Sequence, residues 1–409
     1  MKKKVILLII LVPFLLFGCN TSNKMVKVKL ENSASIERID EPVSIPVSNL
    51  LEKVGDFSTQ SIQVFDGEKE LPYQIVSDMT GDSQLFLVLN FKPKEVKEIV
   101  INYGDVESKT FPNRTYAELV KKKGDVFSEK RYRGTEWEKV TRYKVPATHI
   151  DHDGLFKYEG PGWESELVGY RFYLDWRNST DIFGKKIQKL VLSDIGKYDT
   201  TAHDDSYHNM QEWGMDVFKV GSSLGIGTIG MTGKDGINKV SKTDSVICEI
   251  KSEGPLRSEI QTEYYGWAVD DKKYDLIANL TINAGSRLSK YEMKIKNADN
   301  LSTGLAKFPG TSFVKSSDSG DWQYISLWGK QSLADDELGI ALFYNKKNLI
   351  EHNEDKVSHI VKLQPQKDFA EYYFCAAWVQ EPNSMKTEKE FLSFLDNTLV
   401  KLNNPIIVE

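Results

Sequence analysis

Short runs of apolar and β-branched residues, broken by Gly, Asp and Pro turns, recur along almost the whole chain. Alternation with a period of two residues predicts β-strands, and no long helical periodicity lies between the runs. One open sheet of this size would curl or split, so two large antiparallel sheets packed face to face are expected. From residue 125 onward, the predicted strands are 167–174, 216–220, 246–249, 259–265, 276–282, 289–295, 338–344, 357–363 and 371–378.

The same strand pattern in the N-terminal part of the chain predicts a smaller unit, a small β-sandwich. A polar stretch then separates it from the rest; we expect one short helix at 116–120, and solvent exposure for the lysines at 121–123. The prediction is therefore an all-β protein with an N-terminal β-sandwich domain at 19–109 and a larger β domain at 110–409. The strands expected in the smaller domain are 26–30, 61–65, 84–91 and 98–103.

The C-terminus is the exception to the strand pattern. Thr387 and Glu390 fit a capping box, and Phe391, Leu395 and Leu399 recur every four residues. We predict a helix there whose apolar stripe packs onto the edge of the larger domain.

The N-terminus has the features of an export signal. Three lysines precede an apolar run at 5–17, and the sequence Leu-Phe-Gly-Cys19 resembles a bacterial lipobox. The run is shorter than the roughly 20 residues of a transmembrane helix, so residues 1–18 are interpreted as a lipoprotein signal peptide. We expect lipidation of Cys19 and an exported protein at the outer membrane or in the periplasm, touching the membrane only through its lipid. An uncleaved signal anchor is the alternative.

The net charge limits the classes of binding partner, and the cysteine content limits the possible disulfides. The formal net charge is -6, which gives no sequence-wide basic field for a nucleic acid backbone, so no nucleic acid partner is expected. Any anionic ligand must be met by local cations. Cys248 and Cys375 are the other two cysteines; the sequence leaves open whether they pair or stay as buried thiols.

One glycine motif is misleading. Gly225, Gly227 and Gly230 match the dinucleotide fingerprint G-x-G-x-x-G letter by letter. The fingerprint requires a strand before it and a helix after it, whereas residues 231–236 form a turn sequence. We predict no nucleotide site and interpret the glycines as positions where another backbone or a ligand approaches closely.

Polar, titratable and aromatic residues concentrate in two stretches, 149–178 and 203–219. Four of the six histidines lie there, among many Gly and Asp residues. Loops on a rigid scaffold commonly carry sites, and loops distant in sequence can meet at one edge of a sandwich. The two stretches are therefore expected to form one site. The four histidines are His149, His152, His203 and His208.

Each of these residues also has a structural interpretation. His149 and His152 could cap turns, whereas His203 and His208 could hold a divalent metal with neighbouring aspartates. The spacing is not that of a zinc signature, so no metal or other cofactor is predicted, with a divalent metal left open. A group of tryptophans could belong to the core or could stack on a sugar. A group of arginines could form structural ion pairs or could bind an anion. They are Trp163, Trp176 and Trp213, and Arg142, Arg171 and Arg177.

Three runs, 160–178, 181–185 and 207–221, are similar to domain-of-unknown-function family 4861, which is common in polysaccharide-utilising marine and gut Bacteroidetes. Its members resemble polysaccharide lyases, and the stretch from 253 to 287 is similar to the long strands of their folds. The resemblance implies a galactose-mutarotase-like antiparallel β-supersandwich for the larger domain. One relative in an ulvan-degrading system resembles an oligosaccharide dehydratase acting on a terminal uronic acid.

These observations favour a lyase that performs β-elimination on uronic-acid-containing oligosaccharides, as a dehydratase or a polysaccharide lyase. Such an enzyme must neutralise the substrate carboxylate, remove the C5 proton and protonate the leaving oxygen. Arginine matches a carboxylate bidentately, so Arg171 is the first candidate for neutralisation and Arg142 the second. The expected base is His208, with His203 or His152 as companion, and the expected acid is Tyr207 or Tyr170.

Tyr207 and His208 are adjacent, so both can act only if their segment is a loop and not a regular strand. The expected substrate-binding residues are Trp163, Trp213, Arg142, Tyr170, Glu164 and Lys219. Three alternatives stay open: a glycoside hydrolase, a sugar epimerase, and a non-catalytic glycan-binding lipoprotein. A hydrolase would use two carboxylates. The carboxylates available to it are Glu164, Glu166, Asp205 and Asp216.

Overall fold

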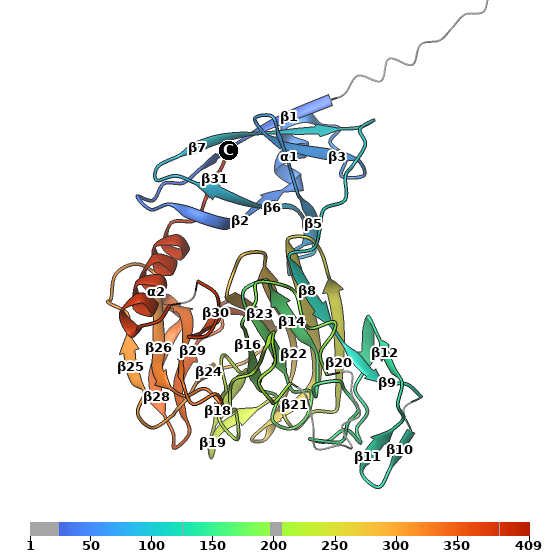
Figure 1. Ribbon diagram of the computed structural model, residues 1–409, viewed down its shortest axis with the longest axis vertical. Coiled ribbons are helices and arrows are strands. Elements are labelled where there is room, and N and C mark those ends of the chain that lie inside the picture. Colours follow the sequence, from blue (N-terminus) through green and yellow to red (C-terminus); the bar gives the residue numbers. More distant parts are fainter. Residues whose placement is uncertain (1–23, 125, 197–206, 384) are drawn as a thin grey trace, which may run out of the picture.

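The computed structural model describes residues 24–124, 126–196, 207–383 and 385–409 and consists mostly of antiparallel strands (Figure 1). The expectation of an all-β protein with a C-terminal helix is therefore confirmed. A smaller unit, built from the N-terminal strands, lies above a larger one in this view. In the described part of the chain, none of the helices is long and apolar enough to span a membrane.

The smaller unit, here called the N-terminal unit, has two facing sheets of order β31-β1-β7-β3-β4 and β2-β6-β5. Val28, Ile45, Leu87 and Ile101 are among the residues that fill the core between them. The C-terminal strand β31 pairs with β1, so both ends of the chain build this unit. The elements are β1 (Lys24–Glu31), β2 (Arg38–Pro46), α1 (Val47–Val54), β3 (Ile62–Asp66), β4 (Lys69–Leu71), β5 (Gln74–Ser77), β6 (Ser83–Phe91), β7 (Val96–Tyr103) and β31 (Ile407–Val408).

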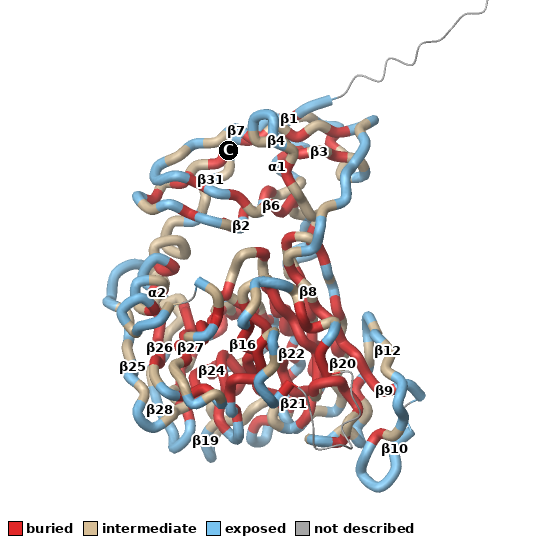
Figure 2. The backbone as a smooth tube through the Cα atoms, viewed as in Figure 1, coloured by how far each residue is buried: buried red, intermediate tan, exposed pale blue. Residues whose placement is uncertain are grey.

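The large unit contains a nine-stranded sheet of order β13-β20-β21-β22-β23-β30-β27-β26-β25. Its strands are β13 (Arg142–Lys144), β20 (Ser245–Ser252), β21 (Arg257–Val269), β22 (Lys272–Asn283), β23 (Leu288–Ile295), β25 (Ser312–Lys315), β26 (Trp322–Lys330), β27 (Glu337–Asn345) and β30 (Phe369–Trp378). One face of this sheet packs on two five-stranded sheets, and the apolar core lies between the layers (Figure 2).

The two five-stranded sheets have the orders β17-β16-β15-β14-β8 and β19-β18-β24-β29-β28. Their strands are β8 (Thr115–Glu118), β14 (Gly162–Ser165), β15 (Gly169–Phe172), β16 (Thr180–Lys185), β17 (Gly214–Asp216), β18 (Gly230–Gly233), β19 (Gly236–Lys239), β24 (Leu301–Ala306), β28 (Leu349–Glu354) and β29 (Ser358–Leu363), with a 3-10 turn η1 at Lys346–Asn348. Two small hairpin-like pairs project to one side in Figure 1: β9 (Val120–Lys122) with β12 (Trp137–Lys139), and β10 (Val126–Ser128) with β11 (Arg131–Arg133).

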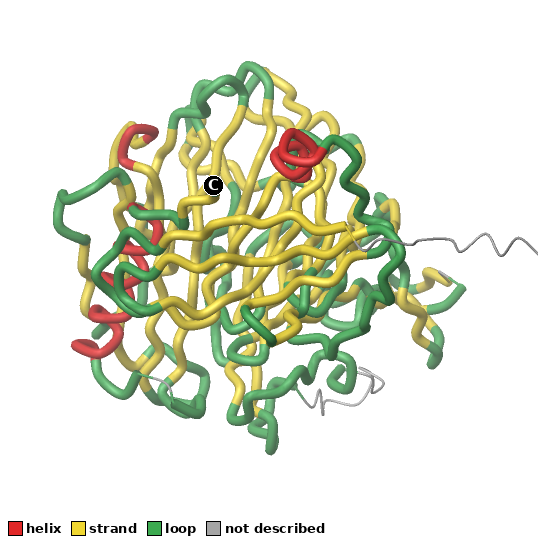
Figure 3. Tube along the Cα trace, turned by 90° about the horizontal axis from the view of Figure 1, so that it is seen from above, coloured by secondary structure: helices red, strands yellow, loops and turns green. Residues whose placement is uncertain are grey.

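The other face of the nine-stranded sheet points away from this core. On β21, Ile260 and Tyr264 are buried in the core, whereas the alternate residues Glu259 and Gln261 line a polar pocket on the opposite face. Helix α2 (Glu388–Asn403) covers one end of that outer face and lies along one edge of the molecule in the view from above (Figure 3).

Helix α2 begins as the sequence predicts. The Thr387 side chain accepts a hydrogen bond from the Glu390 backbone N–H, and the Glu390 carboxylate accepts one from the Thr387 N–H. Phe391, Leu395 and Leu399 are buried against the nine-stranded sheet. The capping box and the packing of the apolar stripe are both confirmed.

Three local predictions have clear outcomes. The short helix at 116–120 is wrong, because this segment forms β8 and the start of β9. Lys121 and Lys122 are buried instead of solvated, since each ammonium lies over an aromatic ring and accepting oxygens surround it. Cys248 and Cys375 are both buried free thiols.

The glycine motif forms no nucleotide site. Gly225 and Gly227 have positive φ values of 53° and 70°, and the segment that follows Gly230 is the hairpin β18–β19 instead of a helix. A Cβ at Gly227 would lie 2.5 Å from the Phe374 ring. The expectation of close approach is confirmed, and its reason is core packing.

Candidate functional site

A network of charged and phenolic side chains lies on the outer face of the sheet that contains β14–β17. On β15, Tyr170 and Phe172 point into the core, so the alternate residue Arg171 points away from it. Arg171 is the direct cross-strand partner of Asp181 on β16, and Asp216 is on the next strand, β17. Strand register therefore brings one guanidinium and two carboxylates together. This acid–base network comprises Glu159, Arg171, Asp181, Tyr207, His208 and Asp216.

Arg171 is the centre of the network. Its Nη2 donates to Asp181 Oδ2 (2.9 Å) and to Asp216 Oδ2 (2.6 Å), and its Nη1 donates to the Tyr207 hydroxyl (3.1 Å). A third carboxylate, Glu159, lies 3.7 Å from Nη1. The Arg171 side chain is only 2 % exposed, so its charge is already neutralised inside the protein.

Burial and these partners shift the pKa of Arg171 in opposite directions. Burial alone would lower the pKa of Arg171, but the surrounding tyrosines and aspartates raise it well above its ordinary value. The prediction that Arg171 binds the substrate carboxylate therefore conflicts with the geometry. Because three carboxylates and a phenol already surround this buried guanidinium, its supported role is to hold Asp216 and Tyr207 in place.

His208 forms an accessible dyad with Asp216. The Nδ1 atom of His208 lies 3.0 Å from Asp216 Oδ2, and 48 % of its side chain is exposed. Tyr207 and His208 lie in a turn, and their ring centroids are 4.3 Å apart. The requirement that this segment be a loop is met, so both side chains reach the same network. Tyr207 is only 3 % exposed, and its hydroxyl contacts Arg171 from within an apolar cluster. An oriented imidazole that solvent can reach is the arrangement of a general base.

A second exposed histidine lies at the opposite end of the network. His152 has a side chain that is 73 % exposed, with Nδ1 3.8 Å from Glu159 Oε1. Glu159 also binds Arg177 at 2.6 Å, in addition to its contact with Arg171. Burial alone would raise the pKa of Glu159, but the two arginines together hold it below its usual range. Arg171 therefore connects the two carboxylates that neighbour the two exposed histidines.

Asp181 differs from the other carboxylates of the network. It is buried, and it accepts a hydrogen bond from the Tyr173 hydroxyl as well as from Arg171. Burial, followed by the negative charge of Asp216, raises the pKa of Asp181. The network thus holds one carboxyl group that gives up its proton less readily than an ordinary aspartate, beside the carboxyl group of Asp216.

One exposed aromatic side chain, Trp176, lies near His152, because it bonds to Asp151, the residue before that histidine. Trp176 is 49 % exposed, and the Lys239 ammonium lies 5.7 Å from its ring centroid. Burial lowers the pKa of Lys239 to about 8. Lys239 donates to Ser179, Ser222 and Ser223, and it forms no ion pair with any of the described carboxylates. Sequence reasoning missed Lys239, since it belongs to a hairpin outside both polar stretches.

Three predicted binding or catalytic residues belong to the interior. Trp163 is 1 % exposed and donates to Ser289, so it cannot stack on a sugar. The Tyr170 hydroxyl is committed to the backbone of Arg287 and Ala376, so it is not the proton donor. Glu164 is fully buried in an ion pair with Lys185. The predictions for Trp163, Tyr170 and Glu164 are wrong, because these side chains face the core or a buried partner.

The remaining predicted residues are not brought into the network. Arg142 is exposed on β13, where it pairs with Glu249 and Glu263. Trp213 packs its ring against Phe183, and Lys219 is exposed on the segment after β17. Trp213 also packs against the apolar cluster that contains Tyr207 and lines a pocket of about 390 Å³, whereas the predictions for Arg142 and Lys219 stay without support from contacts. His203, Asp205 and Cys19 lie outside the described residues.

His149 has a structural role: it is a buried partner of Asp153, at 2.8 Å. Within the described ranges, no group of three or more His, Cys, Asp or Glu side chains is arranged to hold a metal ion. The chemistry that the network can perform is proton transfer by an imidazole and a phenol, next to fixed charges.

The comparisons with known proteins place the chain in a family. Residues 30–408 match the family described as Domain of unknown function (DUF4861), and the chain belongs to it. It is 23% identical over 423 residues to "Uncharacterized protein P7" of Formosa agariphila, covering 100% of this chain and 99% of that protein.

Solved structures give a more distant likeness. An α-mannosidase from Enterococcus faecalis V583 has a TM-score of 0.49 and 12% identity, covering 94% of this chain and 46% of that one. A putative kojibiose phosphorylase from the human microbiome has a TM-score of 0.34 and 11% identity, covering 58% of this chain and 34% of that one. The chain thus spans about half the length of the mannosidase that it matches. Both similarities are to carbohydrate-processing enzymes and are too distant to assign an activity.

Proposed function

We propose that the protein is a carbohydrate-active enzyme that performs β-elimination on uronic-acid-containing oligosaccharides, as an oligosaccharide dehydratase or lyase. The observation that carries the proposal is the His208–Asp216 dyad, which stands beside the Tyr207 phenol and is held by the buried Arg171. A base and an acid next to one another are what this elimination requires.

The reaction can be written with these residues. The neutral His208 imidazole takes the proton from C5 of the uronate, and the electrons of that C–H bond form the C4=C5 double bond. The C4–O bond breaks, and the leaving oxygen takes a proton from the Tyr207 hydroxyl. The products are an unsaturated uronate and either water or a shortened saccharide. Asp216 orients the imidazole and stabilises its protonated form.

The substrate carboxylate needs a cation that is not already paired. Arg171 and Arg177 are both bound to carboxylates of the protein, whereas Lys239 is not. Lys239 lies next to the exposed Trp176 ring, which suits the apolar face of a sugar. We therefore assign to Lys239 and Trp176 the carboxylate and the apolar face of a neighbouring uronate unit of the oligosaccharide, at the His152 end of the network. Trp176 was one of the three tryptophans considered from the sequence, whereas Lys239 was not.

The wider setting of the proposal comes from the sequence. The large unit would be a galactose-mutarotase-like supersandwich, and the substrate an ulvan-like polysaccharide fragment. Residues 1–19 support export and a lipid anchor at Cys19, in the outer membrane or the periplasm. Membrane contact would then be through that lipid, and no nucleic acid would be a partner.

Ultraviolet absorbance of the C4–C5 enoate tests the proposal. Wild-type protein incubated with saturated uronate oligosaccharides should give a steady rise, and His208→Ala should slow it by about 10²–10⁴-fold, the usual contribution of a positioned acid or base. His352→Ala is the matched control: His352 contacts Lys315 and Tyr344, outside the network, so its turnover should be near normal. No absorbance change with wild-type protein would contradict elimination.

The hydrolase alternative has weaker support. Glu164 is paired with Lys185, and Glu166 is held by Arg114 and the Gly285 backbone N–H. Hydrolysis needs two accessible carboxyl groups on either side of the glycosidic bond. It would also release sugar without any ultraviolet signal, so the same assay separates the two reactions.

A further inference from the structure

A cavity that is lined by none of the residues of the acid–base network lies where three parts of the molecule meet. It has a volume of about 380 Å³ and is lined by β2 and β6 of the N-terminal unit, by β21–β23 of the nine-stranded sheet, and by α2. The volume is within the roughly 300–1,000 Å³ of small-molecule sites. We call it the interface cavity.

Arg257 is the unusual residue of this cavity. Its guanidinium lies 5.4 Å from the Phe86 ring centroid, and its Nε is shut off from solvent without a hydrogen-bond partner. Among the residues that the structure describes, no carboxylate forms an ion pair with it. A guanidinium has five donors and is always charged, so leaving it without an acceptor at a half-buried position costs stability.

Asn283 adds an acceptor beside this donor. It is the direct cross-strand partner of Arg257, and both residues line the interface cavity. Its Oδ1 is buried and has no hydrogen-bond partner in the described structure. Native proteins pair nearly all their buried polar groups, so two neighbouring exceptions at one cavity point to a ligand that satisfies both.

The other cations of the cavity are already neutralised. Arg287 pairs with Glu381, and Lys401 lies 3.4 Å from Glu41. Lys290 binds Glu292 at 2.9 Å and Glu371 at 2.8 Å. Arg257 is therefore the cation of the cavity that forms no ion pair in the described structure; its charge opposes the rise in the pKa of Glu259 that burial causes.

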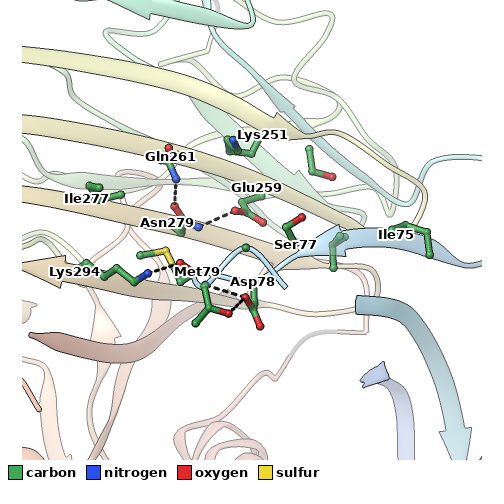
Figure 4. Close-up of a pocket in the computed structure, with 14 residues that line it drawn as sticks. Ile75, Ser77, Asp78, Met79, Lys251, Glu259, Gln261, Ile277, Asn279 and Lys294 are labelled. Carbon is green, nitrogen blue, oxygen red and sulfur yellow. Dashed lines mark hydrogen bonds between the residues drawn. The ribbon is translucent and has the colours of Figure 1, made fainter. Parts of the chain in front are cut away.

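The same face of the sheet stays polar beyond the cavity. A neighbouring pocket of about 610 Å³ lies under the loop that follows β5 (Figure 4). In this pocket Gln261 donates a hydrogen bond to Asn279, and Asn279 donates one to Glu259. These side chains lie on the same face of β21 and β22 as Arg257 and Asn283. A hydroxyl-rich ligand that extends beyond the cavity would find amide and carboxylate partners there.

From this geometry we infer that the interface cavity binds a hydroxylated carboxylate, of the chemical class of a sugar acid. The ligand carboxylate accepts hydrogen bonds from the Arg257 guanidinium, and an adjacent hydroxyl donates to Asn283 Oδ1. The aromatic side chains of Phe86, Trp322 and Tyr373, which line the cavity, contact the body of the ligand. This site is independent of the acid–base network and of the reaction proposed for it.

Ligand-observed NMR titration with D-glucuronate and D-glucose tests the site on the full chain. Wild-type protein should bind glucuronate and discriminate against glucose. Arg257→Gln removes the charge and should weaken glucuronate binding by roughly ten- to hundred-fold, the worth of a charge-assisted hydrogen bond. Asn283→Asp keeps the shape, adds a negative charge and should weaken binding as well. Arg133→Gln, which removes a half-buried arginine paired with Glu129, is the matched control and should bind as wild type.

Circular dichroism of each variant confirms that it is folded before it is titrated. Two results would overturn the inference: equal binding of glucuronate and glucose by wild-type protein, or unchanged glucuronate affinity in both Arg257→Gln and Asn283→Asp. Loss of binding in His208→Ala, but not in Arg257→Gln, would place the ligand in the acid–base network and overturn it too. The ultraviolet assay of elimination is unaffected by any of these outcomes, so the two proposals fail separately.

Discussion

Two arginines on outward sheet faces, Arg171 and Arg257, are in opposite electrostatic states. Arg171 is surrounded by three carboxylates and a phenol of the same chain. Arg257 has no carboxylate within ion-pair distance in the described structure. The Nε atoms of both arginines are buried without a hydrogen-bond partner, so the difference lies in the carboxylates. A guanidinium that the protein itself neutralises serves to fix the groups around it. One that the protein leaves unpaired is where an external anion is expected.

The difference should be visible first in stability. Arg171→Gln leaves Glu159, Asp181 and Asp216 without their counterion, and breaking a buried ion network by removing one partner costs about 3–5 kcal/mol. Arg257→Gln removes a charge that forms no ion pair with the described carboxylates and should change the free energy of unfolding by less than about 1 kcal/mol. Urea unfolding followed by circular dichroism measures both. Equal losses in the two variants would remove the distinction between them.

The pH dependence of stability sharpens the account of the Arg171 region. Because the pKa of Asp181 is raised in the folded state, the native protein binds this proton more tightly than the unfolded chain. That contribution to stability is complete below the ordinary pKa of about 3.9 and is lost as the pH rises through the raised value.

Asp181→Asn removes this titration. Relative to wild type, the variant should therefore gain more than about 1.4 kcal/mol between pH 4 and neutral pH, the equivalent of one pKa unit. The free energy of unfolding of both proteins, measured across that range, gives the difference. A difference that does not change with pH would contradict the raised pKa.

The interface cavity depends on how the N-terminal unit is attached, and Gln74 tests this. Its side chain donates to Ser252 Oγ and to the Arg257 carbonyl, and it accepts from the N–H groups of Leu256 and Arg257. Gln74→Ala should cost about 1 kcal/mol of stability and weaken glucuronate binding, while the elimination rate stays within about twofold.

Gln63→Ala is the control for this change, because the hydrogen bond described for the Gln63 side chain goes to the backbone of Glu107 and not to the large unit. It should leave both glucuronate binding and elimination unchanged. An equal fall of the elimination rate and of binding in Gln74→Ala would mean that the two regions are one functional unit.

Local patterns were enough to predict part of this structure. The strands follow from alternation with a period of two, and α2 follows from Thr387, Glu390 and an apolar repeat, all within one segment. Helix α1 was missed because it has eight residues and its N-cap, Pro46, makes no side-chain capping bond. Lysines 121 and 122 were misread because burial by aromatic rings from other strands leaves no trace in their own sequence.

The candidate site shows where sequence reasoning ends. A strand pattern shows that Tyr170 and Arg171 face opposite sides, but the side that is buried depends on the sheet packed against it. The convergence of Arg171 with Tyr207 and His208 was expected, and the structure places them together. Asp181 and Asp216 form ion pairs with Arg171 because the register between strands places them next to it. No local sequence pattern specifies that register.

Mass spectrometry of products tests the role of the acid–base network most directly. Wild-type protein and His208→Ala are each incubated with a defined, saturated uronate oligosaccharide. The expected result with wild type is a product that has lost one water, or a cleaved pair of which one member carries an unsaturated uronate, with little product from His208→Ala. Fragments that have gained water, or unchanged substrate with wild-type protein, would contradict elimination at this site.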